Sequence, residues 1–376
     1  MRTVPPDCAG PRRRSARTLC HHAAVAQSYL FALWAGGGNV NPFLCLAQHL
    51  LDRGHRVGAV ATASLQARLA ATGVDLVTAS DGWLPGADDL LAAVRESAPD
   101  VLVVDYMLTS ALCGAERAGR PTVALVHTLY RELLLDGSPN PIGMTGPVAA
   151  VNEVRVANGL APVASHAALL DAAEVVLVAA PRELDASGEV PGNVVYAGAL
   201  FEGPGPDTGW LPPGGEGPLV AVSLGTAGDP VEVELLQRIL VALAALPVRG
   251  FLTVPDYIDR ARLELPDNAT VSGYVRHAAV MPHADLLVTH AGLGSVVVAL
   301  AHGVPMVCLP LAREQPDNAR AVVRIGAGRA LHTDASAEEI RAAIAEQLDR
   351  PDRVRLAPDP RRAVDLLERL ARDCEA

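Results

Sequence analysis

Lysine is absent from the chain, so all 31 basic residues among its 376 are arginines. Without lysine, neither Schiff-base chemistry nor the phosphate-binding lysine of the P-loop enzymes is available. The 42 acidic residues outnumber the basic ones and leave a net charge of −11. Because a phosphate backbone is bound by a net basic surface, we do not expect nucleic acid as a partner.

Cysteine and aromatic residues are also scarce. The six cysteines are scattered without a C-x-x-C pair, so we expect no zinc ribbon, redox motif or disulfide framework, as is usual in a reducing cytoplasm. Aromatic residues make up 3% of the chain and hydrophobic residues 50%, so the core must consist mainly of Ala, Val and Leu. This composition excludes a disordered or collagen-like chain.

A long apolar run is missing as well. The first apolar stretch, residues 28–35, is too short to span a membrane and leads directly into a glycine-rich turn. Residues 1–27 before it contain an arginine cluster and no periodic pattern, and we interpret them as a disordered leader. A cytoplasmic protein without a membrane partner is therefore expected.

Strand and helix patterns alternate along the chain in two similar halves. The strands predicted for the first half are residues 28–35, 55–62, 74–80, 100–106, 121–127 and 175–180. Those of the second half are residues 219–225, 249–255, 269–275, 285–292, 305–311 and 328–333. Such alternation is typical of an α/β fold with parallel sheets covered by helices on both faces. We therefore predict two Rossmann-like, doubly wound domains.

The boundaries of these domains follow from the composition. Residues 203–218 contain so much Gly and Pro that they are predicted to be a linker. The first domain then spans residues 28–202 and the second residues 219–348, followed by a helical tail at residues 349–376. Since ligands of such folds bind at the carboxyl ends of the strands, we expect the site in a cleft between the domains.

The segment from residue 285 to 319 has the most specific pattern in the chain. A buried strand is predicted to end at Thr289, and after a glycine-rich turn Gly294 and Ser295 begin a helix, whose free N–H groups can bind a phosphate. His290, at the strand end, can add a donor to the same phosphate. The loop after the next strand contains the polar residues Glu314, Gln315, Asp317 and Asn318. Because these side chains can bind hydroxyls, the segment suggests a nucleotide sugar as ligand.

Each of these features has an ordinary structural explanation when it is taken alone. In this order and spacing, however, they resemble the donor-binding signature of the family 1 glycosyltransferases, roughly His-x-Gly-x-Gly-Ser/Thr, Gly-Val-Pro, Pro, Asp/Glu-Gln and Asn-Ala. The stretch GGGNVNPFLCLAQHLLDRGHRV resembles the amino-terminal opening of the same family. The resemblance extends from about residue 28 to the C-terminus. It implies the GT-B fold, with the acceptor on the first domain and the donor on the second, and the bacterial branch that decorates secondary metabolites.

The resemblance also implies a donor site. The residues that bind the diphosphate would be His290, Gly292, Gly294 and Ser295. The sugar hydroxyls would be bound by Glu314 and Gln315, and Asn318 would support the loop that carries these two residues. The nucleobase would be bordered by Tyr274, Val275 and Arg276. The phosphates would be faced from the other side by Ser223, Gly225 and Thr226, although Ser-x-Gly-Thr at a strand end is also found as a plain turn.

The catalytic base is where this chain departs from the family. The family motif has a histidine after the glycine of the first turn, and this position holds Asn39, whose amide is not basic. Asp105, at the end of a neighbouring strand, could serve as base directly or could equally cap the next helix. His127, at the end of the following strand, is a second candidate for the base. On this interpretation Asp105→Ala loses far more turnover than Asn39→Ala.

A second departure is Val298. Family members often have a glutamate at this position that binds both ribose hydroxyls, and valine offers no acceptor. A deoxyribose lacks the 2′-hydroxyl, so a dTDP-deoxysugar is expected to fit better than UDP-glucose.

The implied reaction transfers a sugar from an NDP-sugar to a hydroxyl, amine or aromatic carbon of a small apolar acceptor, with inversion at the anomeric carbon. No cofactor beyond the donor substrate and no metal are expected, since the chain has no Asp-x-Asp motif and its acidic and histidine groups lack ligand spacing. A monomer or homodimer is expected. The alternative is a homologue that binds a nucleotide sugar, has lost the catalytic histidine and acts as an auxiliary partner protein.

Three other enzyme classes share some of these features. A nucleotide-sugar epimerase on the same two-domain plan is possible, but it would not need an apolar acceptor pocket. A dehydrogenase of the G-x-G-x-x-G type is excluded because Asn41 replaces the last glycine and no acid ends the second strand. A serine hydrolase is excluded because no G-x-S-x-G is present.

Overall fold

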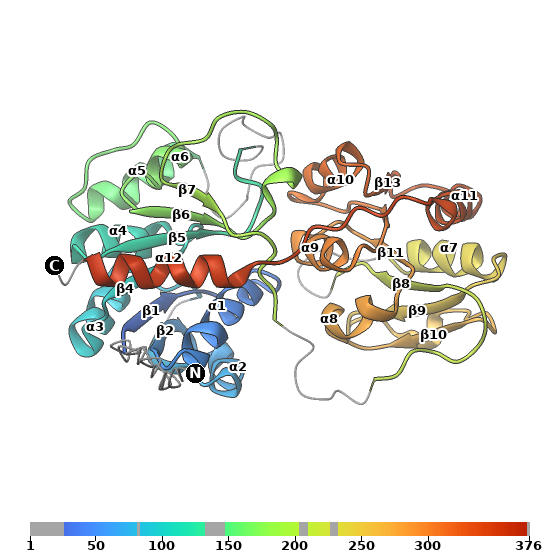
Figure 1. Cartoon of the computed structure of the whole chain (residues 1–376), viewed down its shortest axis with the longest axis horizontal. Coiled ribbons are helices and arrows are strands. Elements are labelled where there is room, and N and C mark those ends of the chain that lie inside the picture. The colour runs from blue at the N-terminus through green and yellow to red at the C-terminus, as the bar shows by residue number, and fades with distance from the viewer. Residues whose placement is uncertain (1–25, 81–82, 132–146, 203–209, 226–231, 374–376) are drawn as a thin grey trace, which may run out of the picture.

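The computed structural model of the chain describes residues 26–80, 83–131, 147–202, 210–225 and 232–373. They form two lobes, each built on one parallel sheet, with the first domain on the left and the second on the right in Figure 1. The predicted leader lies almost entirely outside the described residues, as do residues 203–209 of the predicted linker.

The sheet of the first domain contains seven described strands in the order β3-β2-β1-β4-β5-β6-β7. The strands are β1 (Ser28–Ala32), β2 (Arg56–Thr62), β3 (Asp75–Ser80), β4 (Val101–Asp105), β5 (Thr122–Val126), β6 (Val175–Val178) and β7 (Val194–Tyr196). The central strands β1, β4 and β5 are buried along their whole length and mainly apolar, as is required of a parallel sheet covered on both faces.

Helices cover both faces of this sheet. The described helices of the first domain are α1 (Val40–Asp52), α2 (Gln66–Thr72), α3 (Ala87–Ser97), α4 (Thr109–Ala118), α5 (Val148–Ala157) and α6 (His166–Leu169). The apolar side chains of α1 and α2 share one core cluster with one face of the sheet, and those of α3 to α6 share another cluster with the opposite face. Alternate side chains of β1 reach the two clusters because successive strand residues point to opposite faces.

The second domain repeats this plan with six described strands in the order β10-β9-β8-β11-β12-β13. These are β8 (Leu219–Ser223), β9 (Arg249–Thr253), β10 (Ala269–Ser272), β11 (Leu286–Thr289), β12 (Met306–Cys308) and β13 (Gly328–Ala330). Its helices are α7 (Val233–Ala244), α8 (His277–Val280), α9 (Leu293–His302), α10 (Gln315–Arg324) and α11 (Ala337–Asp349). In both sheets the strand order reverses beside the first strand of the domain, which is where such folds bind their ligands.

Most predicted elements are confirmed, with two differences. Every predicted strand is present, but β7 was not predicted, because its three residues follow a Gly- and Pro-rich stretch and are too few to show a pattern. The helical region predicted at residues 146–173 consists of α5 and α6 separated by irregular chain that contains Pro162.

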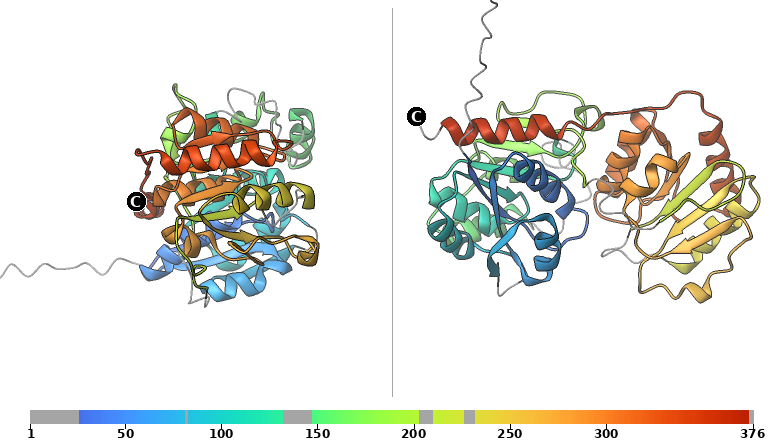
Figure 2. Two further views of the ribbon diagram at one scale, coloured as in Figure 1. Left: turned by 90° about the vertical axis from the view of Figure 1, so that its right-hand side faces the viewer. Right: turned by 60° about the horizontal axis from the view of Figure 1, so that its bottom comes forward.

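The last helix, α12 (Pro360–Asp373), returns from the second domain to the first. After α11 the chain crosses between the lobes, and α12 lies along the first domain in Figure 1 and in the right-hand view of Figure 2. Its apolar face joins the core cluster of β1 and α1, with Val364 and Leu367 fully buried. Glu368 lies 3.0 Å from both Arg53 and His55, which follow α1. The predicted tail is therefore a structural part of the first domain.

We expect Leu367→Ala to destabilise the first domain by about 2–5 kcal/mol, since it removes a fully buried side chain from a core that cannot collapse around the cavity. Urea unfolding of the full chain, with hydrogen exchange of the β1 amides as the probe of the first domain, measures this change. Arg369→Ala, an exposed position of the same helix, is the control and is expected to cost less than about 0.5 kcal/mol. Equal midpoints for the two variants would show that α12 does not support this domain.

Candidate active site

Asp105 is the last residue of β4, and its carboxylate is completely buried. Oδ1 accepts a hydrogen bond from the Met107 backbone N–H at 3.0 Å, which stabilises the turn after the strand. Oδ2 accepts one from the Asn39 side-chain amide at 3.2 Å. Asp105 thus holds the turn before α4 and does not cap that helix as predicted, because the N-cap residue is Leu108 and the helix has no side-chain cap. Its carboxylate has no exposed surface.

His127 follows β5, the strand beside β4, and meets the same carboxylate. Its Nε2 lies 3.1 Å from Oδ1 and 3.2 Å from Oδ2 of Asp105. Because a carboxylate only accepts hydrogen bonds, Nε2 carries the proton and Nδ1 is the basic nitrogen of the neutral ring. The ring packs edge-on against Tyr106, with 5.0 Å between centroids. The structure therefore joins two residues that the sequence analysis treated as separate candidates.

The charge around His127 favours its protonated form. Burial by itself would lower the pKa of the imidazole, but the adjacent Asp105 carboxylate, with a further contribution from Glu314, raises that pKa above its usual value. Glu314 belongs to the second domain, on the loop between β12 and α10. A residue predicted to bind the donor sugar is therefore close enough to act electrostatically on a candidate base from the first domain.

Asn39, which precedes α1, donates a hydrogen bond to the same carboxylate. Its amide nitrogen donates to the Trp34 carbonyl at 3.0 Å as well as to Asp105. Its side-chain oxygen is buried and has no hydrogen-bond partner among the described residues. Asn39 and His127 approach Asp105 from the strands on either side of β4, because β1 and β5 flank β4 in the sheet.

The predicted diphosphate turn joins β11 to α9. Ala291 has a left-handed backbone with φ of 64°, an uncommon conformation for a residue with a side chain. Its N–H is bound by the Thr289 hydroxyl at 3.2 Å, and its carbonyl accepts a hydrogen bond from the Asn318 amide at 2.9 Å. Asn318 is completely buried on α10. Asn318 was predicted to support the loop of Glu314 and Gln315; the contact that the structure shows ties α10 to the β11–α9 turn instead.

His290 lies in this turn between two glycines. A Cβ at Gly292 would lie 2.6 Å from His290 Nε2, and one at Gly225 would lie 3.1 Å from the same atom. Gly225 also has a φ of 95°, a left-handed conformation that favours glycine. Gly294 and Ser295 follow in the first turn of α9. The Ser295 N–H already donates to the Gly292 carbonyl at 3.0 Å, so the donors that a helix start leaves for a ligand are here the N–H groups of Leu293 and Gly294. The ends of β8 and β11 thus converge on the imidazole. The contact predicted between Gly225 and the phosphates stays a prediction, and Thr226 lies outside the described residues.

The polar residues of the loop before α10 and of the start of this helix are not all at the surface, although their sequence suggests that they are. Gln315 is buried, and its side-chain oxygen accepts hydrogen bonds from the backbone N–H groups of Leu311 at 2.8 Å and Ala312 at 3.0 Å. This side chain therefore shapes the loop, and its predicted contact with the sugar stays a prediction. Glu314, beside it, is partly exposed.

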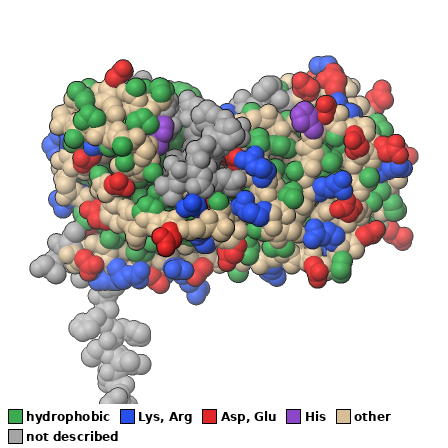
Figure 3. Space-filling view, turned by 90° about the horizontal axis from the view of Figure 1, so that it is seen from above, with side chains coloured by type: hydrophobic (Ala, Val, Ile, Leu, Met, Phe, Trp, Pro, Cys, Tyr) green, Lys and Arg blue, Asp and Glu red, His purple; other side chains and the backbone are tan. Residues whose placement is uncertain are grey.

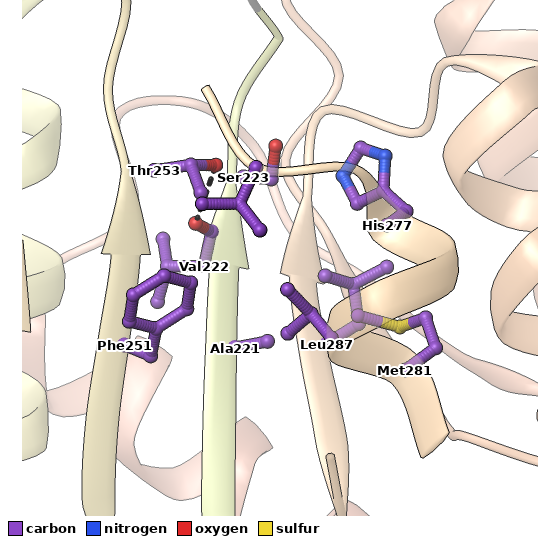
Figure 4. Close-up of a pocket in the computed structure, with 10 residues that line it drawn as sticks. Ala221, Val222, Ser223, Phe251, Thr253, His277, Met281 and Leu287 are labelled. Carbon is purple, nitrogen blue, oxygen red and sulfur yellow. Dashed lines mark hydrogen bonds between the residues drawn. The ribbon is translucent and has the colours of Figure 1, made fainter. Parts of the chain in front are cut away.

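A very small cavity of about 10 Å³ lies at the carboxyl ends of β8 and β9. Figure 4 shows Ser223 and Thr253 at the strand ends, with His277 of α8 across from them. Val275, one of the predicted nucleobase residues, also lines the cavity. Burial, with the neighbouring His290 adding to it, lowers the pKa of His277 to about 4, so this imidazole is neutral at pH 7. Sequence reasoning missed His277, although it directly follows the predicted segment.

The other predicted nucleobase residues lie outside this cavity. Tyr274 is 60% exposed. Arg276 lies 3.6 Å from Glu202, and the same carboxylate bonds to Arg68 of α2. Glu202, at the end of the first domain, therefore ties residues of both domains together. This contact was missed because nothing in the sequence around Glu202 indicates its partners.

No group of three or more His, Cys, Asp or Glu side chains in the described parts of the chain is placed to hold a metal ion. None of the described helices is long and apolar enough to cross a membrane.

Comparison with known proteins identifies the family. The sequence profile described as "UDP-glucoronosyl and UDP-glucosyl transferase" matches residues 164–353, about half of the chain. The chain belongs to this family. It is a glycosyltransferase, and the match covers the β11–α9 turn, the α10 loop and the nucleobase segment.

The relatives of this glycosyltransferase cover nearly the whole chain. It is 27% identical to 4′-demethylrebeccamycin synthase of Lentzea aerocolonigenes, over 86% of this chain and 92% of the relative. It is 28% identical to the oleandomycin glycosyltransferase of Streptomyces antibioticus, over 89% of this chain and 88% of the relative.

Solved structures show the same architecture. The glycotransferase of kitacinnamycin superimposes with a TM-score of 0.76 at 26% identity, covering 92% of this chain and 99% of the other. The calicheamicin glycosyltransferase CalG4 gives a TM-score of 0.73 at 25% identity, covering 93% of this chain and 100% of the other. The GT-B fold expected from the sequence is confirmed.

Proposed function

We propose that this glycosyltransferase moves a sugar from a nucleoside diphosphate donor to a small natural-product acceptor, with inversion and without a metal ion. The observation that carries the proposal is the turn between β11 and α9, in which His290 lies against two glycines and Asn318 holds the backbone. A helix start with free N–H groups and an adjacent imidazole is a binding site for a phosphate.

The chemistry follows from where charge develops. As the bond between the anomeric carbon and the diphosphate breaks, the sugar becomes oxocarbenium-like and negative charge grows on the leaving group. The N–H groups at the start of α9 and the His290 imidazole are suited to stabilise this charge, because donors aimed at developing charge are effective in a site that excludes water. These groups supply a role that a bound cation has in other transferases, which supports metal independence.

Inversion follows from a single displacement. The acceptor oxygen, nitrogen or carbon attacks the anomeric carbon from the face opposite the diphosphate, and a base on the first domain takes its proton. Figure 3 shows the two lobes side by side on the face seen from above. The first domain is the proposed side for the acceptor, because the second holds the phosphate turn.

The donor nucleotide is proposed to be dTDP. Val298, on α9, is buried in the apolar core and offers no acceptor to a ribose 2′-hydroxyl. A 2′-deoxyribose has no such group to satisfy, so its donor loses nothing by binding here. Calorimetry with dTDP and UDP tests this proposal, and equal affinities would contradict it.

The acceptor is proposed from the relatives, whose names refer to rebeccamycin and oleandomycin, and from the absence of a basic or membrane-binding feature in the composition. A small apolar secondary metabolite is consistent with the names of these relatives and with the composition of this chain. The alternative of a non-catalytic partner protein was based on the loss of a histidine at position 39, and the His127–Asp105 pair weakens that basis.

The purified protein, incubated with dTDP- and UDP-sugars and a panel of aglycones, is expected to release nucleoside diphosphate and form a glycoside. The anomeric configuration of the product, measured by NMR coupling constants, is expected to be opposite to that of the donor. EDTA at millimolar concentration is expected to leave the rate unchanged. Nucleotide binding without glycoside formation across the panel would favour the partner protein instead, and retention of configuration would contradict the single displacement.

A further inference from the structure

We propose that His127 is the base of the transfer reaction and that Asp105 is its positioning residue. The acceptor's nucleophile is then received on the β5 side of Asp105, away from the β1–α1 turn that carries Asn39. This inference rests on the proposed function, because it names the group that takes the proton in that reaction.

The geometry distinguishes three polar side chains that meet at one carboxylate. Asp105 is completely buried, Asn39 is 7% exposed, and the His127 side chain is 11% exposed. A base must combine basicity with access to the acceptor, and Asn39 lacks the first property while Asp105 lacks the second. Only His127, of these three, has both.

The tautomer also favours this role. Nε2 is occupied by the two carboxylate oxygens at 3.1 and 3.2 Å, so the lone pair is on Nδ1, on the other edge of the ring. Asp105 in turn is held by Met107 and Asn39, so the carboxylate cannot rotate away from the imidazole. A base held in this way by a buried carboxylate is the arrangement that activates hydroxyl nucleophiles in other enzymes.

The negative charges that act on the ring suit the reaction. When Nδ1 takes the acceptor's proton, an imidazolium forms beside the Asp105 carboxylate. The negative charges of Asp105 and Glu314 both stabilise this imidazolium. In the same step the bond from the nucleophile to the anomeric carbon forms, the bond to the diphosphate breaks, and its electron pair leaves with the nucleoside diphosphate. The imidazolium then releases its proton to solvent, which returns the enzyme to its starting state.

A purely structural role for His127 makes a different prediction. In that case the ring would only donate a hydrogen bond to Asp105, and glutamine, which also carries an N–H donor, would serve as well. His127→Gln therefore separates the two roles. The matched control is His49→Gln, since His49 is a partly buried histidine of α1 whose ring contacts the Cys45 carbonyl at 2.8 Å, outside the site.

We expect His127→Gln to lower kcat about 10²- to 10⁴-fold, the usual contribution of a general base. The substrates are the dTDP- or UDP-sugar and aglycone that the unaltered enzyme turns over fastest. The dTDP affinity by calorimetry is expected to stay within about twofold, because the donor turn is on the other domain, and H49Q is expected to keep full kcat. If H127Q keeps more than about a tenth of kcat, the proposal is overturned.

The pH profile tests the positioning role of Asp105. The imidazole must be neutral to accept a proton, so kcat is expected to fall on the acid side of a pKa raised above the ordinary histidine value of about 6.5. Asp105→Asn removes the charge that raises this pKa, so the acid limb should move to lower pH as kcat drops. An acid limb that stays in place in D105N, or that persists in H127Q, would overturn the assignment.

The side on which the nucleophile lies is tested by moving the imidazole. Adding Asn39→His to H127Q places a ring on the β1 side of the same carboxylate, where the Asn39 amide now lies 3.2 Å from Oδ2. We expect no recovery of kcat, and full recovery would overturn the β5 placement. Failure of the proposed function itself would differ from all of these results, since the unaltered enzyme would then form no glycoside.

Discussion

Replacing Gly292 by alanine is expected to weaken the binding of dTDP or UDP about 10- to 100-fold, the worth of a hydrogen bond to a charged group. Gly292 has φ of −59° and ψ of 136°, which alanine adopts without strain. The added Cβ, however, would lie 2.6 Å from His290 Nε2, so the imidazole must move. The substitution therefore displaces His290 and leaves the start of α9 in place.

A double-mutant cycle separates this effect from other consequences of the substitution. In a His290→Ala background the ring is gone, so Gly292→Ala is expected to cost little further nucleotide affinity. His290→Ala alone should weaken binding by an amount similar to that of G292A. Additive losses would show that the methyl group acts by another route, and full affinity in H290A would remove the imidazole from the donor site.

Asn318→Asp is expected to cost about 3–5 kcal/mol of unfolding free energy at neutral pH and to abolish nucleotide binding. The change is nearly isosteric, but it replaces the N–H donor that holds the Ala291 carbonyl at 2.9 Å with a charged acceptor in a completely buried position. An unpaired buried charge costs several kcal/mol. The same carboxylate would also repel the diphosphate proposed to bind at the adjoining turn.

Asn318→Ala is the control, because it loses the hydrogen bond without introducing a charge. Its expected cost is about 1–3 kcal/mol, the penalty of leaving one buried carbonyl unpaired. Urea unfolding measures the free energy of unfolding of both variants. The difference between the two free energies should become smaller as the pH falls, since protonation neutralises the aspartate. Equal stabilities at pH 7 would mean that the site tolerates a charge and is more hydrated than its burial indicates.

The fold could be predicted from the sequence because its signals are local. Apolar runs such as those of β4 and β5 are continuous, and turn residues separate them from amphipathic helices, so strand positions and the parallel arrangement follow. The diphosphate turn is also a short contiguous segment, from His290 to Ser295. The short β7 was missed because three residues at the edge of a sheet show no period.

The site was predicted less completely, because its residues meet only in three dimensions. Asp105 and His127 were both candidates, yet their contact depends on β4 and β5 being neighbours. The burial of Gln315, with its oxygen turned to the backbone, could not be read from its position in a polar run. The contacts of Glu202 with arginines of both domains had no signal in the sequence.

The amino-acid sequence by itself determined that this chain is a two-domain α/β protein with a glycine-rich turn before a helix in its second half, the turn proposed to bind phosphate, because alternating periodicity and a glycine-rich helix start depend on neighbouring residues. Only the tertiary structure decided which side chain at the Asp105 carboxylate is accessible, and that α12 completes the first domain. Both depend on contacts between residues far apart in the chain, and such contacts are set by the strand order and by which surfaces remain to be buried once the sheets have formed.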